Sequence, residues 1–220
     1  MKQLIALLVL LCSSLNLWAQ EQVPDAGQAG ETPYQVIETA ATSLQQSLVG
    51  KQDYYGDNLD ELYQLIDDKL LPVFDVRYSG YLVLGNHWKP ATEEQRSRFI
   101  EAFYTFLVRS YAKGLLGFNQ QDLEIYPEVY SKDKKKAEVR TELKLANGTK
   151  VPVNYRLRNS KRGWRVYDVR IEGVSYVQNY RSQFNAEIAA EGIDAVIQRL
   201  ETEQEKAIES PLTEAAQTTG

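Results

Sequence analysis

The chain has very few of the side chains from which metal sites and nucleophilic active sites are usually built. Among its 220 residues there is one cysteine, Cys12, and one histidine, His87. A zinc-type site needs several such ligands, so we predict no metal site. The sequence also has no Gly-x-Ser-x-Gly nucleophile motif and no glycine-rich phosphate loop. We therefore predict neither a catalytic residue nor a cofactor.

Positive charge and long apolar runs are scarce as well. Lysine and arginine together number 25 against 30 aspartate and glutamate residues, which gives a formal net charge of −5. This balance argues against general nucleic-acid binding, which needs a positive surface. After the first 20 residues no apolar segment approaches the roughly 20 residues that a membrane-spanning helix needs. We expect a soluble mature protein.

Residues 1–19 have the pattern of a secretory signal peptide. Lys2 precedes a short apolar run, and the small residue Ala19 stands before a polar stretch. We predict cleavage after Ala19 and export from the cytoplasm. Cys12 leaves a lipoprotein anchor open as an alternative, although the bulky Leu11 before it does not suit such a signal. Cleavage after Ala19 would remove the only cysteine, so the mature protein would have no disulfide.

The remaining sequence predicts one domain over 33–203, between a flexible leader at 20–32 and a polar tail at 204–220. Apolar residues at helical spacing predict helices over about 33–49, 59–71, 92–116 and 175–190, with a last helix from 193. Asp75 is placed to cap a short helix that ends near Gly85. Thr92 and Gln95 form a capping box at the start of the longest helix.

Between these helices the apolar period changes from 3.6 to 2. The alternation predicts a four-stranded antiparallel meander over about 123–130, 137–145, 151–157 and 164–172, with a hairpin turn at Asn147-Gly148. We place Tyr167 on the same apolar face as Val169. Helices before and after a twisted sheet predict a single α+β domain in which the helices cover the apolar face.

Tyrosine is the residue in excess, with 14 copies, several on apolar faces. Aromatic and aliphatic walls with a polar mouth are typical of an apolar ligand pocket, although a filled core is the alternative. From face and position we predict a pocket wall of fourteen residues. They are Val73, Phe74, Val76, Tyr78, Leu82, Phe99, Phe103, Phe106, Val139, Val153, Tyr155, Val169, Ile171 and Val174.

Two carboxylates and one basic run remain. Asp75 and Asp168 lie among apolar residues, and we predict structural roles: a helix cap for Asp75 and, for Asp168, a pair with one of the nearby arginines. An isomerase or hydratase that uses either carboxylate with a tyrosine is the alternative. The run 132–136 predicts a solvated turn, with contact to anionic headgroups or to an acidic partner left open.

Short motifs spread over most of the mature chain resemble those of one family. They are Leu70-Leu71-Pro72, Tyr78-Ser79-Gly80, 82–85, 89–92, Glu94-Gln95-Arg96, Phe99, 163–169, 172–175, Tyr180-Arg181 and Gly192-Ile193-Asp194. In this combination the chain resembles the MlaC family, periplasmic phospholipid-binding proteins of the Mla transport system that are also described as toluene-tolerance proteins. The polar C-terminal tail departs from the family pattern.

The resemblance implies a fold similar to the nuclear-transport-factor-2 class and a carrier that maintains outer-membrane lipid asymmetry. It implies that phospholipid acyl chains enter a hydrophobic cavity while the headgroup stays near solvent. It also implies docking to an outer-membrane lipoprotein–porin complex and to an inner-membrane ABC transporter complex with its substrate-binding subunit. We expect a monomer that binds no nucleic acid. An adaptor whose pocket is filled by side chains is a further alternative.

Overall fold

The computed structural model describes residues 30–118, 122–145 and 147–202. The predicted signal peptide, the tail at 204–220 and most of the predicted leader lie outside these ranges. Within them, no helix is both long enough and apolar enough to span a bilayer.

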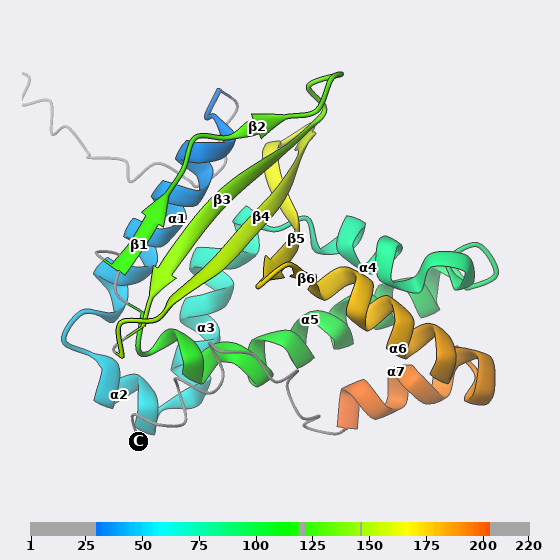
Figure 1. Ribbon diagram of the computed structural model, residues 1–220. Helices are drawn as coiled ribbons and strands as arrows, with labels where there is room; N and C mark the ends of the chain where they lie inside the picture. Colours follow the sequence, from blue (N-terminus) through cyan, green and yellow to red (C-terminus); the bar gives the residue numbers. More distant parts are fainter. Residues whose placement is uncertain (1–29, 119–121, 146, 203–220) are drawn as a thin grey trace, which may run out of the picture.

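The described chain is an α+β fold, as the sequence predicts (Figure 1). Helices come first, a sheet follows, and two helices end the described part. The first helices are α1 (Pro33–Leu48), α2 (Gln52–Asp57), α3 (Leu59–Leu70), η1 (Leu71–Val73), α4 (Val76–Leu84), η2 (Gly85–His87) and α5 (Glu93–Leu115). The last two are α6 (Tyr176–Glu191) and α7 (Ile193–Thr202).

Side-chain caps fix where the helices begin. Thr92 accepts the backbone N–H of Gln95, and the Gln95 side chain accepts the N–H of Thr92, which confirms the predicted capping box of α5. Thr32 forms the same arrangement at α1, where Pro33 occupies the first turn. Asp75 accepts the N–H of Tyr78 and caps α4, also as predicted. Helix α2 was not predicted, because its six residues bury no side chain and therefore show no apolar period.

The sheet has more strands than the four that alternation predicts. Its long members are β3 (Lys136–Lys144), β4 (Lys150–Ser160) and β5 (Gly163–Ile171), which form the expected antiparallel meander. The predicted strand at 123–130 is instead two short strands, β1 (Leu123–Ile125) and β2 (Val129–Tyr130), which both pair with β3. Pro127 interrupts them because it has no N–H to donate. A short β6 (Val174–Ser175) pairs with the end of β5.

A β-bulge between Arg156 and Leu157 changes which residues of β5 face inward. Beyond the bulge Leu157 pairs with Val166, so Val166 joins the apolar cluster beneath the sheet. Tyr167 instead packs against Arg156 and Lys136, whose charged groups lie 5.2 and 5.4 Å from its ring centroid. The prediction that Tyr167 shares the apolar face with Val169 is therefore wrong, because a bulge shifts the alternation by one residue.

The apolar side chains form four separate clusters. Helix α1 packs on the sheet, with Val36 and Ile37 against Val139, Leu157 and Val166. A second cluster joins α4 to α7 with one another, and a third joins the ends of α1 and α5 to α3. A fourth, small cluster lies at the other end of the sheet's inner face. In Figure 1 the sheet and α1 lie together, while α4 to α7 form a distinct group beside them.

Candidate functional site

Five of the predicted wall residues meet on the inner face of the sheet. The register places Tyr155 opposite Val139 on β3 and opposite Val169 on β5, and places Val153 opposite Ile171. Their side chains therefore form one continuous apolar surface across three strands. The surface is bounded at one end by α1 and at the other by Tyr176, the first residue of α6.

Two further predicted residues join this surface at the sheet edge. Val73 belongs to the cluster between α1 and the sheet, and Phe74 packs against it. Phe74 also forms an isolated bridge with Val166, and the N–H of Asp75 donates to the carbonyl of Val166 at 2.7 Å. The segment between α3 and α4 thus runs along β5 and extends the apolar wall by two residues.

The three α5 phenylalanines lie in a different place. Phe99, Phe103 and Phe106 are at most 4% exposed and pack on Tyr180 and Phe184 of α6. The ring centroids of Phe103 and Tyr180 are 5.2 Å apart in an edge-to-face contact, a favourable aromatic geometry. These rings form the core of the helical group, and the structure does not bring them into the sheet cluster.

The other four predicted residues are scattered. Tyr78 lies under the Arg158 guanidinium, 4.2 Å from its ring centroid, and against Tyr167. Leu82 is half-buried on α4, and Val174 is 52% exposed on β6. Val76 lines a surface groove described below. None of the four is in the apolar clusters of the sheet.

Two side chains on the inner face of the sheet are less buried than their neighbours. Tyr155 and Val169 each touch both sheet clusters, yet both side chains stay partly exposed. Burial alone raises the pKa of Tyr155 to about 12, so its hydroxyl lies deep in the protein. This face of the sheet is the candidate binding site.

Tyr176 is a residue of this site that the sequence did not reveal. It contacts the helical group and the end of the sheet, and its ring lies 5.6 Å from that of Tyr111. Its hydroxyl is buried and has no hydrogen-bond partner among the described residues. A buried donor without a partner suggests a ligand or water that completes it. The sequence feature that could have identified Tyr176 is its position where the last predicted strand gives way to a helix, in a chain rich in tyrosine.

Two carboxylates hold helices to the opposite, polar face of the sheet. Asp75 caps α4 and accepts a hydrogen bond from Arg158 Nε at 2.6 Å. Asp168 accepts from the Ser175 hydroxyl at 2.8 Å and from the N–H of Val177 at 3.1 Å, and it pairs with Arg156 at 3.5 Å. These contacts bear out the predicted structural roles. Both carboxylates are already engaged, which weighs against their use as the general base of an enzyme.

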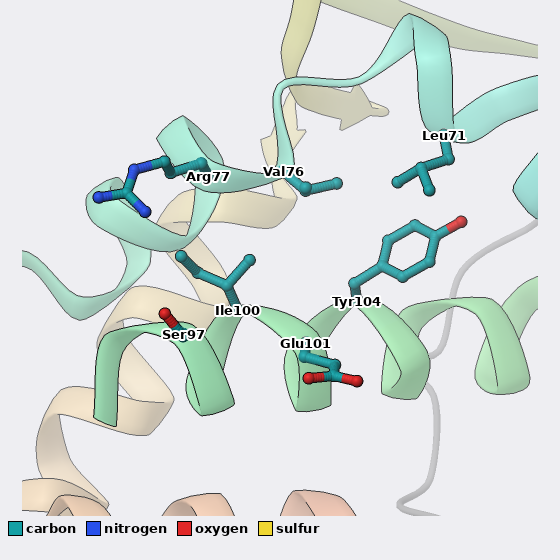
Figure 2. A pocket seen from close by; sticks show the side chains of 7 residues that line it. All are labelled: Leu71, Val76, Arg77, Ser97, Ile100, Glu101 and Tyr104. Carbon is teal, nitrogen blue, oxygen red and sulfur yellow. The ribbon is translucent and has the colours of Figure 1, made fainter. Parts of the chain in front are cut away.

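A small groove opens on the surface between α4 and α5 (Figure 2). Its volume is about 240 Å³, below the roughly 300–1,000 Å³ usual for small-molecule sites. Val76, Ile100 and Tyr104 line it, and Arg77 and Glu101 lie at its rim. The groove is too small for a two-chain lipid. In the described ranges, no three His, Cys, Asp or Glu side chains are grouped so that they could hold a metal ion.

The fold and the candidate site define a class of protein: an α+β domain with a largely apolar inner sheet face next to a group of helices. The buried carboxylates on the opposite, polar face, Asp75 and Asp168, have structural roles. Comparison with known proteins identifies the family. The family model for MlaC protein matches residues 38–202. The chain belongs to the MlaC family.

Individual relatives agree with this assignment. The chain is 27% identical over 177 residues to the intermembrane phospholipid transport system binding protein MlaC of Haemophilus influenzae, covering 79% of this chain and 82% of that protein. It is 30% identical over 167 residues to toluene tolerance protein ttg2D of Pseudomonas putida, covering 76% and 77%. A solved phospholipid-binding protein from Ralstonia solanacearum, in complex with a phospholipid, matches with a TM-score of 0.68 and 30% identity. That match covers 74% of this chain and 92% of that chain.

Proposed function

We propose that this protein is a periplasmic phospholipid carrier that holds acyl chains in a cavity between the inner face of the sheet and the helices. The observation that carries the proposal is the likeness to the Ralstonia protein, which was solved with a phospholipid bound. Val153, Tyr155, Val169 and Ile171 would form the sheet wall of the cavity. Tyr176 would lie at its helical end, where its hydroxyl is free to donate to a polar group of the lipid.

The energetics explain why a carrier needs such a wall. Burying a methylene group is worth about 0.8 kcal/mol, so two chains of roughly 16 carbons would cost about 25 kcal/mol to leave in water. An aliphatic and aromatic wall shields them without contacts specific to any one headgroup. We therefore propose loose headgroup selectivity. The protein would shuttle lipid between an outer-membrane lipoprotein–porin complex and an inner-membrane ABC transporter complex, whose ATPase would supply the energy.

Lipid analysis of the purified protein tests the proposal. The full chain would be expressed with its own first 19 residues, recovered from the periplasmic fraction and extracted for mass spectrometry. About one diacyl phospholipid per protein is expected, against background lipid in an unrelated exported protein purified in parallel. Absence of lipid both as purified and after incubation with vesicles would overturn the carrier and favour the filled-core adaptor.

A further inference from the structure

Two hairpin turns at one end of the sheet bring six cations together. The β2–β3 turn supplies four lysines and the β4–β5 turn a lysine and an arginine. The turns are adjacent, since the N–H of Asn159 donates to the carbonyl of Lys135 at 2.9 Å and Lys136 pairs with Arg158 across the strands. We call this region the basic tip; all six of its residues are exposed. They are Lys132, Lys134, Lys135, Lys136, Lys161 and Arg162.

The charge of the basic tip is only partly offset, by the one carboxylate that lies between its lysines. Within the part of the chain that the structure describes, none of the six cations forms a salt bridge. The one carboxylate between them, Asp133, accepts hydrogen bonds from the Ser131 hydroxyl at 2.6 Å and from the N–H of Lys135 at 3.1 Å. The Ser131 contact holds the pKa of Asp133 below its usual value. This local concentration of positive charge contrasts with the net −5 of the chain.

Hydrogen bonds fix the β2–β3 turn with Lys132, Lys134 and Lys135 exposed, whereas the ammonium of Lys136, also exposed, lies over the rings of Tyr78 and Tyr167. The Ser131 N–H and hydroxyl both donate to the carbonyl of Lys136, and the N–H of Lys134 donates to the carbonyl of Ser131. Lys134 adopts a φ of 55°, which few lysines do without such support. Figure 1 shows this turn projecting from the end of the sheet, away from α5, α6 and α7.

Exposed apolar side chains lie next to these cations. Val129 and Tyr130 form β2, and they are 56% and 41% exposed. The Tyr130 ring rests edge-on against Trp164 at 5.7 Å, which fixes its position beside the tip. Tyrosine with flanking lysine is a pattern that favours the boundary between lipid headgroups and water.

The composition of the tip distinguishes between possible partners. Five of the six cations are lysine, which is depleted at protein–protein interfaces, whereas arginine is enriched there. Lysine clusters instead bind anionic bilayers through summed electrostatic attraction that needs no fixed geometry. We propose that the basic tip, with Val129 and Tyr130, docks this protein on a bilayer surface that contains anionic phospholipid. The proposal does not depend on lipid binding in the interior.

Vesicle flotation with paired variants tests this docking. The tip variant carries Lys132→Gln, Lys135→Gln and Lys161→Gln, and the control carries Lys51→Gln, Lys89→Gln and Lys113→Gln. All six positions are exposed and both variants lose three charges, so they differ only in where the charge is lost. The full chain and both variants would be floated with vesicles of phosphatidylcholine alone and with 30% phosphatidylglycerol added (about one anionic lipid in three).

We expect the unmodified chain and the control to bind the anionic vesicles at low salt, and to bind pure phosphatidylcholine far less. The tip variant should bind about fivefold more weakly for each lysine removed. Raising the salt should release the bound protein. Equal weakening in the control would show that binding follows total charge and would overturn the proposal. Absence of a preference for anionic vesicles would also overturn it and would point to an acidic protein partner. Lipid extracted from the tip variant should be unchanged, which separates this result from a failure of the carrier proposal.

Discussion

At the scale of single residues, Val153 is the sharpest test of where lipid lies. It is 4% exposed on the inner face of the sheet, beside Tyr155 and Ile171. If the proposed cavity lies against this strand face, Val153→Trp should lower the lipid recovered per protein by at least about fivefold, because the indole would occupy it, at a stability cost of about 1–3 kcal/mol. Mass spectrometry and thermal unfolding measure the two effects. Val49→Trp, at a position that is 61% exposed, is the matched control. Normal loading of the Val153 variant would show that this strand face is not the wall.

Tyr155 predicts how stability depends on alkaline pH. Its pKa is raised by burial from 10.0 to about 12, so between these values the unfolded chain loses the phenolic proton while the folded chain keeps it. Stability should therefore fall as the pH rises through this window, and it should fall less steeply in Tyr155→Phe. Urea unfolding at pH 9 and pH 11 measures the difference. Tyr81→Phe controls for loss of an exposed phenol, and identical slopes for Tyr155→Phe and the unmodified chain would contradict the prediction.

At the scale of secondary-structure elements, Asp168 connects α6 to β5. Asp168→Asn removes the charge that faces Arg156 and weakens two hydrogen bonds at the start of α6. We expect a loss of about 1–3 kcal/mol in the free energy of unfolding. Hydrogen exchange should also quicken at the first turn of α6 more than elsewhere. Asp57→Asn, an exposed change at the end of α2, should stay within about 0.5 kcal/mol. Uniform loss of protection across all helices would argue against a local connection.

The elements show what the sequence could and could not predict. The caps at Thr92 and Asp75 are local chemistry, so spacing alone located α5 and α4. The division of one predicted strand at Pro127 was also local and could have been recognised. The bulge at Arg156 was not predictable, because it depends on how β4 and β5 pair, and it moved Tyr167 to the polar face.

The candidate site was predicted only in part for a similar reason. Strand alternation correctly grouped Val139, Val153, Tyr155, Val169 and Ile171. Periodicity on α5 identified a buried stripe, but it could not say that Phe99, Phe103 and Phe106 face α6 rather than the sheet. Tertiary packing decides which neighbouring element a buried helix face contacts. The apolar period of one segment carries no information about its neighbours.

At the scale of the whole molecule, the proposed carrier function predicts that the cargo contributes to stability. A lipid held between the sheet and the helices, as proposed, would bind only the folded state. Stripping it should therefore lower the Tm by about 5–10 °C. Calorimetry before and after delipidation measures the shift, and reloading from vesicles should restore the original Tm. Equal Tm values for loaded and stripped protein would be inconsistent with cargo in the interior.

The packing of α1 on the sheet has a consequence for the order in which the protein is made. Val36 and Ile37 are translated early, whereas their partners Val139, Leu157 and Val166 come much later in the chain. Because synthesis proceeds from the N-terminus, the apolar stripe of α1 is complete long before any surface exists to receive it. Nascent chains stopped before β5 should therefore be held by chaperones, because in them the stripe of α1 has no sheet surface to cover it.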